Sequence, residues 1–219
     1  MPNWVTNKVS APSHVIASIV SADDGRVDFE RIVKFEGEFP WDGVYVDAET
    51  MAEVVVGTRL SSNPFIGALE AANRAGADIK KLSDESFEQF IQMLRNFRKV
   101  GFLHSMDFAR AKWGTKWNAC DSSADIEAGT AEFDTAWSCP VPIFEALSRK
   151  FPEDVITVTY ADEDIGSNCG TFSMRNGEEI SSEIAPSWHD MTNAERAKWK
   201  AFACEVTGRD PKDYEDEEA

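Results

Sequence analysis

Two segments far apart in the chain follow the same order of elements, and this repetition constrains the fold more than any other feature. Lys8-Val9-Ser10-Ala11-Pro12 leads from a β-favouring stretch into a helical pattern, and Ala136-Trp137-Ser138-Cys139-Pro140 does the same. β-Branched and aromatic residues favour strands, whereas proline is favoured in the first turn of a helix. Each segment therefore predicts a strand that runs directly into a helix.

A hairpin is expected between these two units. The polar stretch 121–130 separates two patterns of period two, as in a pair of antiparallel strands. The resulting order, βαββαβ, is the split βαβ arrangement of an α+β, ferredoxin-like fold. We expect its strands at residues 4–10, 115–120, 132–138 and 155–160, with a further strand at 169–175 added at an edge of the sheet.

The first half of the chain carries a helical pattern that this order does not require. Asn63-Pro64 is typical of a helix start, and Ser83 precedes a run of apolar residues spaced by three and four. We therefore expect a helical insertion at about 60–110 within a single domain of residues 1–208. Those apolar residues are Phe87, Phe90, Ile91, Leu94 and Phe97.

Two further regions complete the outline of the fold. Residues 26–60 hold several aromatic side chains among glycines and a proline, which favours irregular structure, with a strand at Val44–Val46 as the one element expected there. Thr192 and Glu195 have the spacing of a capping box and predict a C-terminal helix that Gly208 closes. An acidic tail, residues 209–219, follows.

The charge of the chain is strongly negative and uneven. Lys and Arg number 22 against 39 Asp and Glu, a net charge of −17. Residues 153–219 hold 17 acidic and 6 basic side chains and so carry most of this charge. Such a balance disfavours binding to nucleic-acid phosphates and favours a basic partner, although a solvated tail that aids solubility is the simpler alternative. The acidic candidates for partner binding are Asp162, Glu163, Asp164, Asp213, Glu215, Asp216, Glu217 and Glu218.

The sequence offers little that is typical of metal, cofactor or nucleophilic chemistry. The cysteines Cys120, Cys139 and Cys169 lack metal-ligand spacing and are expected as small buried side chains. Asp162–Asn168 holds several oxygen donors but fails the spacing of a calcium loop, so a solvated acidic turn is expected. The three histidines lie outside any nucleophile motif, and no glycine-rich phosphate loop is present. We expect no cofactor and no metal, and a location in the reducing cytoplasm.

Several motifs carry a resemblance to a known family. The opening Asn3-Trp4-Val5-Thr6-Asn7, the stretch Trp113-Gly114-Thr115-Lys116-Trp117 and the stretch Thr135-Ala136-Trp137-Ser138 together resemble the YubB-like proteins with a ferredoxin-like domain. The likeness covers roughly residues 1–20 and 110–175. It implies a ferredoxin-like fold and an origin on plasmids, phages or prophage-bearing bacterial chromosomes. It implies no iron–sulfur cluster and brings no catalytic residues with it.

The tryptophans of these motifs form a candidate binding face together with one lysine and one aspartate: Trp113, Lys116, Trp117, Asp134 and Trp137. Aromatic side chains on a ferredoxin-like sheet are used to stack bases in RNA-recognition modules, but core packing is the simpler expectation in so acidic a chain. A cross-strand pair would stack Trp117 on Trp137.

Two functions remain open from the sequence. The first is a non-enzymatic, acidic interaction protein of mobile-element origin, acting for instance as an inhibitor or nucleic-acid mimic on a basic host defence protein. The second is a small-molecule or nucleotide-binding domain that uses a tryptophan-lined pocket between the sheet and the inserted helices, with Asp134 as acid or base if it is an enzyme. A non-enzymatic role is favoured, and direct nucleic-acid or membrane binding is not expected.

Overall fold

The computed structural model describes residues 3–214, which divide into two compact units. The sheet unit consists of the described residues up to Lys34 and from Ala109 onward, and the helical unit is Phe35–Phe108. The helical unit is thus inserted into the chain of the sheet unit. The acidic residues Glu215, Asp216, Glu217 and Glu218 lie outside the described part.

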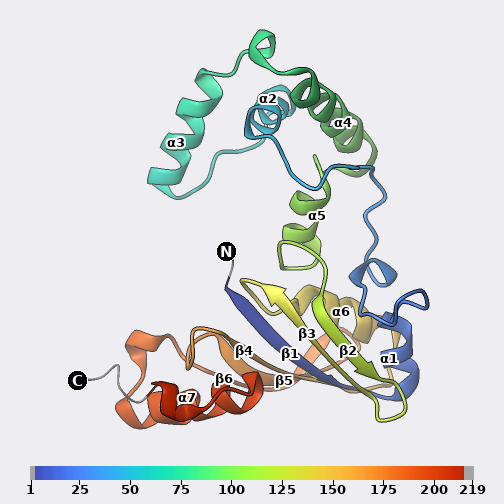
Figure 1. Ribbon diagram of the computed structural model, residues 1–219, viewed down its shortest axis with the longest axis vertical. Helices are drawn as coiled ribbons and strands as arrows, with labels where there is room; N and C mark the ends of the chain where they lie inside the picture. The colour runs from blue at the N-terminus through green and yellow to red at the C-terminus, as the bar shows by residue number, and fades with distance from the viewer. Residues whose placement is uncertain (1–2, 215–219) are drawn as a thin grey trace. The chain divides into compact units, whose positions relative to one another are not determined.

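In the sheet unit, six of the described strands form one antiparallel sheet in the order β2-β3-β1-β4-β5-β6 (Figure 1). Strands β1 to β4, in the order 2-3-1-4, have the topology of a ferredoxin-like fold, as the sequence predicted. The bounds are β1 Trp4–Ser10, β2 Cys120–Asp125, β3 Thr130–Ala136, β4 Ile156–Asp162, β5 Cys169–Arg175 and β6 Glu178–Ile184.

The helices follow the sequence patterns closely. Proline stands just before or at the start of α1, α3 and α6, while Thr192 and Glu195 form the predicted capping box of α7. The α-helices are α1 Ser13–Ile19, α2 Val46–Val56, α3 Pro64–Ala75, α4 Asp84–Val100, α5 Ser105–Lys112, α6 Val141–Lys150 and α7 Asn193–Thr207. Short 3-10 helices occur at Phe29–Arg31, Ile79–Lys81, Trp188–Asp190 and Pro211–Tyr214.

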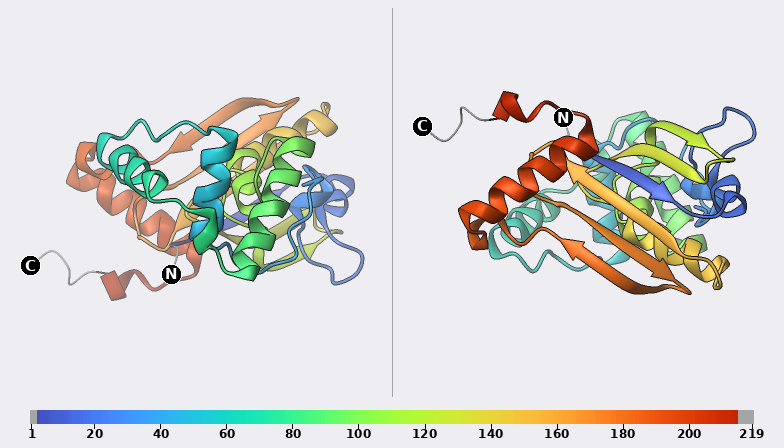
Figure 2. Two further views of the ribbon diagram at one scale, coloured as in Figure 1. Left: turned by 90° about the horizontal axis from the view of Figure 1, so that it is seen from above. Right: turned by 90° about the horizontal axis from the view of Figure 1, so that it is seen from below.

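Helices cover both faces of the sheet. On one face, the Phe133 ring of β3 lies 6.4 Å from that of Phe144 in α6, and the buried residues of β1 alternate with partly exposed ones. On the other face, α7 packs over β4 near one end of the sheet, where Trp199 and Ala203 contact Ala161 (Figure 2). Much of the remainder of that second face is lined by polar side chains, among them Lys8, Glu132 and Thr159.

Two of the strand predictions for the sheet unit need correction. The strand expected at 115–120 begins only at Cys120, because the preceding residues are held in irregular structure by side-chain hydrogen bonds. The Thr115 hydroxyl donates to the carbonyl of Ala136 at 2.8 Å, and Asn118 Oδ1 accepts from Phe29 N at 2.9 Å. The strand at 169–175 forms as predicted but is not the edge, since β6 pairs with its outer side.

Strand β6 is the outer edge that the sequence analysis did not predict. It is exposed along its whole described length, and three of its residues are glutamates: Glu178, Glu179 and Glu183. An exposed edge invites pairing with other chains, and charged side chains there disfavour such pairing. Only Ile180 and Ile184 are apolar in this strand, which is too weak an alternation to predict it from the sequence.

A helix stands where irregular structure with a strand at Val44–Val46 was expected. Residues Val46–Val56 form α2, which ends at Gly57 with φ 72°. Its β-branched valines favour strands, but Ala48, Met51 and Ala52 lie on one helical face and are buried against α4. Tertiary packing therefore overrides the local preference. The insertion was expected at about 60–110, whereas the helical unit starts at Phe35 and includes α2.

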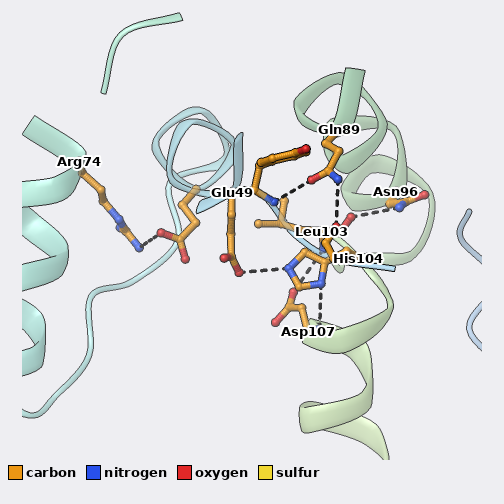
Figure 3. Close-up of polar contacts among 10 residues, drawn as sticks. Glu49, Arg74, Gln89, Asn96, Leu103, His104 and Asp107 are labelled. Carbon is orange, nitrogen blue, oxygen red and sulfur yellow. Dashed lines mark hydrogen bonds and ion pairs between the residues drawn. The ribbon is translucent and has the colours of Figure 1, made fainter. Parts of the chain in front are cut away.

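Buried amides fix the irregular segment that opens the helical unit. Asn96 donates to the carbonyls of Glu38 and Leu103 at 2.8 and 3.0 Å, and its Oδ1 accepts from Glu38 N. Gln89 accepts from Tyr45 N and donates to Gly43 O, both at 2.9 Å (Figure 3). These two α4 side chains satisfy backbone groups that no regular element pairs.

Candidate functional site

Trp137 has the most unusual backbone of the residues in the predicted binding face. Its φ is 74°, a left-handed value that is rare for a bulky side chain, and the residue is 55% exposed. Its N–H donates to Asn3 O at 2.9 Å, and its carbonyl accepts from Asn168 Nδ2 at 3.4 Å. The surrounding structure thus holds a large aromatic side chain at the surface, where β3 ends.

The loop beside Trp137 is built around one buried carboxylate. Asp162, at the end of β4, is 5% exposed and accepts from Asn168 Nδ2 at 2.8 Å and from Asp164 N at 2.9 Å. Asn3 Nδ2 adds a longer contact of 3.4 Å. Asn168 therefore links this carboxylate to the carbonyl of Trp137, and Asp162 shapes the loop from inside.

The other acidic candidates lie nearer the surface. Glu163 Oε2 is 3.8 Å from Arg209 Nη2, and Arg209 also donates to the carbonyl of Glu163. The Asp164 carboxylate accepts from the Ser167 hydroxyl at 2.8 Å and is otherwise directed to solvent. Asp213 lies in the exposed 3-10 helix Pro211–Tyr214. The loop after β4 consequently presents two surface carboxylates close to the end of β3.

The remaining aromatic candidates are split between the two faces of the sheet. Trp113 is buried, with its Nε1 donating to Val33 O at 2.8 Å and its ring 5.8 Å from that of Phe29 on the α6 side. Trp117 contacts Trp4, which alternates with the inward-facing Val5 and so lies on the opposite face.

The predicted stacking of Trp117 on Trp137 is wrong. Trp117 lies 6.1 Å from the ring of Trp4, tilted by 52°, and Lys116 Nζ lies 4.7 Å from the Trp117 ring. Trp117 precedes β2 and therefore has no place in the strand register opposite Trp137.

Asp134 lies on the same sheet face as Trp4 and accepts from the Thr6 hydroxyl at 2.9 Å. Burial raises the pKa of this carboxyl above its ordinary value, and the hydrogen bond from Thr6 opposes that rise. Its strand partner Cys120 is half-buried, and burial raises the pKa of that thiol too. This carboxyl and the Trp4–Trp117 pair form a second, smaller group of polar and aromatic side chains.

The sequence motifs are tied to one another by hydrogen bonds. Besides the contact from Thr115 to Ala136, Ser138 Oγ donates to Gly114 O, and Thr135 Oγ1 donates to Ser138 O at 2.8 Å. Much of the W-G-T-K-W and T-A-W-S patterns therefore serves to fix the chain where these two segments meet. Trp137 is the member of the two motifs that this arrangement leaves most exposed.

The titratable groups singled out for other chemistry have structural roles. His104 is 1% exposed, accepts from Asp107 N at 3.2 Å through Nδ1 and contacts Glu49 Oε1 at 3.1 Å through Nε2 (Figure 3). Cys139 and Cys169 are buried. Within residues 3–214, no cluster of three or more histidine, cysteine or acidic side chains is arranged to hold a metal ion. No helix of that part is long and apolar enough to span a membrane.

Three residues near Trp137 were not predicted as members of its site. Trp4 and Asn3 belong to the opening motif, and their proximity follows only from the pairing of β1 with β3. Asn168 was considered solely as an oxygen donor for a metal, whereas its amide nitrogen holds the loop. Its φ is 43°, a left-handed value that asparagine adopts more readily than most residues. The asparagine at this loop position was therefore the one feature of the sequence that could have indicated its role.

The strand order and the covering helices define the sheet unit as a ferredoxin-like α+β domain. Residues 112–202 match the family model described as "Ferredoxin-like domain in Api92-like protein". The chain is also similar to the crystal structure of protein api92 from Yersinia pseudotuberculosis, with 12% identity and a TM-score of 0.36, over 85% of this chain and 99% of that one. No curated protein matches the chain.

Proposed function

We propose that this protein is an acidic, non-enzymatic interaction protein that binds a basic partner protein, with Trp137 and the acidic loop after β4 as its contact point. The observation that supports this best is the exposed Trp137, held with φ 74° and joined through its carbonyl to Asn168 of the loop that carries Glu163 and Asp164. Left-handed backbone in a bulky residue costs of order 1–3 kcal/mol and is concentrated at functional sites. Binding a partner would offset this cost if the backbone conformation keeps the Trp137 side chain at the surface as an anchor.

The chemistry of the site suits a lysine- or arginine-rich surface. Tryptophan and arginine are enriched among residues that dominate binding energy, and a cation over an indole contributes roughly 0.5–2 kcal/mol. Glu163 and Asp164 supply carboxylates on the loop that Asn168 joins to the carbonyl of Trp137, and the net charge of −17 adds long-range attraction for a cationic surface. The carboxylates of residues 215–218 extend that charge in the sequence.

The origin and setting belong to the same proposal. The resemblance to YubB-like proteins supports a mobile-element origin, and a basic, nucleic-acid-handling host protein, such as a component of a defence system, fits the charge. The protein would act in the cytoplasm as an inhibitor or nucleic-acid mimic, without binding nucleic acid itself. The same charge that attracts such a partner repels polyanions.

A second candidate function rests on Asp134. A half-buried carboxyl with a raised pKa beside an aromatic pair is a common feature of ligand sites. In this case a small molecule or nucleotide would contact Trp4, Trp117 and Asp134 on the open sheet face. Calorimetric titration with a panel of nucleotides, compared between the wild type and Asp134→Asn, tests this candidate.

The leading proposal is tested by capture from a bacterial lysate with three immobilised forms: wild type, Trp137→Ala and Ile180→Ala. Ile180 is 53% exposed on β6 and serves as a matched surface control. We expect wild type and Ile180→Ala to retain the same basic proteins at low salt and Trp137→Ala to lose them. If Trp137→Ala retains them equally, Trp137 is not the anchor. If the retained proteins are not basic, the electrostatic part of the proposal is wrong.

A further inference from the structure

Helix α3 in the helical unit exposes the side of an amphipathic helix that is normally buried. Phe65 and Leu69, one turn apart, are 80% and 56% exposed. Within Pro64–Ala75, which the structure describes in full, Gly67 alone is buried. A helix of this length is marginal without packing of its apolar face, so another source of stability must hold it.

Polar contacts at both ends provide that stability. Asn63 caps the first turn by accepting from Phe65 N and Ile66 N, and Glu70 accepts from Ser61 N at 2.7 Å. At the other end, Arg74 donates to the carbonyl and the hydroxyl of Thr58 at 2.6 and 2.7 Å. It also reaches the carboxylate of Glu53 in α2 at 3.2 Å (Figure 3). Helix α3 is thus fixed to α2 without use of its apolar face.

A groove of about 630 Å³ lies between α2 and α3. On α3, residues 65, 69, 72 and 76 share one face at helical spacing, so the exposed Phe65 and Leu69 extend the wall that Ala72 and Gly76 form. On α2, Val46 lines the groove and is 70% exposed. The groove therefore combines apolar side chains from both helices with polar ones such as Thr50 and Asn73, and it is open to solvent.

The charges at this groove are mainly negative. Asp47 and Asp78 line it against the one cation Lys81 among the described lining residues. Asp47 lies in the first turn of α2, and Asp78 caps the following 3-10 helix, so both carboxylates are held in place. The groove therefore carries two carboxylates together with the apolar side chains of α2 and α3.

From these features we propose that the α2–α3 groove binds an amphipathic helix of another protein, with leucine-like side chains on its inner face and lysine or arginine on its flanks. An apolar helix face laid into a groove is a common mode of recognition. Because the carboxylates of Asp47 and Asp78 are negative, the flanks of the bound helix should carry positive side chains. A second copy of the chain is disfavoured as occupant because its groove would carry the same carboxylates and its net charge is also −17. Anionic membranes are disfavoured for the same reason.

This site is independent of Trp137, and a defined probe tests it. The probe is a dye-labelled 15-residue helical peptide of leucine and lysine, with leucines at the spacing i, i+3, i+4, i+7. One comparison peptide has every lysine replaced by glutamate, and another has the leucines scrambled over all faces. Fluorescence anisotropy should show binding of the leucine–lysine peptide at least tenfold tighter than that of either comparison peptide. Equal affinities would overturn the proposal.

Charge-adding variants separate docking in the groove from general attraction to an acidic chain. Leu69→Asp and Phe65→Asp make the protein more negative, so general attraction predicts tighter peptide binding, whereas the groove predicts at least a tenfold loss. Ile184→Asp, at another residue exposed by 46%, is the matched control and should bind as the wild type does. If Leu69→Asp fails to fold, Phe65→Asp decides, since Phe65 is the more exposed residue.

Two other outcomes would identify a different occupant for the apolar face of α3. Concentration-dependent dimerisation of the wild type that Leu69→Asp abolishes would identify a second copy as the occupant and overturn the proposal. Binding to phosphatidylcholine vesicles that Leu69→Asp abolishes would identify a lipid surface and do the same. Trp137→Ala should leave the affinity for the peptide unchanged. The experiment can therefore contradict the groove proposal without contradicting the function proposed for Trp137, and the reverse.

Discussion

Asn168 donates its side-chain amide to the carbonyl of Trp137 at 3.4 Å, and both residues have positive φ, 43° and 74°. The same amide nitrogen contacts Asp162 Oδ2 at 2.8 Å. One asparagine therefore connects the backbone of the exposed Trp137 to the buried carboxylate that shapes the acidic loop. Two residues with uncommon backbone conformations are in direct contact, which indicates that the surrounding fold enforces the local structure. This enforced structure is the reason for proposing that Trp137 binds a partner.

The left-handed backbone of Trp137 predicts an unusual order of stability among its variants. Glycine adopts positive φ without strain, whereas alanine does not. Trp137→Gly should therefore be more stable than Trp137→Ala, by about 1 kcal/mol in the free energy of unfolding. Urea denaturation of both variants measures this difference. The reverse order, which helix and strand propensities would give, would show that the backbone at 137 is relaxed.

The buried carboxylate of Asp162 is expected to stabilise the loop. Asp162→Ala removes the nearer acceptor of the Asn168 amide and the side-chain acceptor of Asp164 N–H, at a cost of about 1–3 kcal/mol in the free energy of unfolding. Glu163→Ala, which removes a half-exposed carboxylate, should cost less than about 1 kcal/mol. Thermal unfolding of the two variants at neutral pH provides the comparison. Equal effects would mean that Asp162 is not the organising residue.

Asp134 predicts a pH dependence of stability. Burial raises its pKa in the folded protein, so the folded state holds this proton more tightly than the unfolded state does. Its contribution to stability is therefore lost as the pH rises from the unfolded pKa through the folded one. Asp134→Asn should be more stable than the wild type at pH 7, and the gain should shrink as the pH is lowered. A gain that is constant down to pH 3 would contradict this account.

The four cysteines should differ in reactivity. Burial raises the pKa of Cys139 well above its ordinary value and that of Cys169 to about 11, so few of these thiols are ionised at pH 8. Cys120 is the least buried of the four. Iodoacetamide at pH 8 should modify Cys120 first and reach the others at appreciable rate only in urea, as peptide mass mapping will show. Modification of Cys139 ahead of Cys120 would be inconsistent with this structure.

Much of the fold was predictable because its signals are local. Pro140 and the apolar spacing of α6, the capping box at Thr192 and the alternation in β1 each determine an element within a few residues. The repeated strand-to-helix unit then limits the topology to one familiar arrangement. Helix α2 could not be predicted in this way, because its valines favour strands and only contacts with α4 make it helical.

The site was harder to predict because it depends on strand register and on loop geometry. Trp137 was selected for its motif, and nothing local distinguishes it from Trp113, which the structure buries. The contact of Trp117 with Trp4 depends on where β2 begins. The hydrogen bond that Thr115 donates and the one that Asn118 accepts keep the residues before Cys120 out of the strand. The exposure of Phe65 could not be predicted either, since an apolar stripe in a helical sequence normally predicts burial.

The central claim is that a basic partner is held by Trp137 and the surrounding carboxylates, and its salt dependence tests this most directly. The affinity of the purified partner captured at low salt should be measured for the wild type and Trp137→Ala from about 0.05 to 0.5 M salt, a range over which exposed charges become largely screened. We predict that the wild-type affinity falls steeply with salt and that Trp137→Ala is at least tenfold weaker throughout. An affinity that is unchanged across this range and unaffected by the loss of the indole would contradict the account.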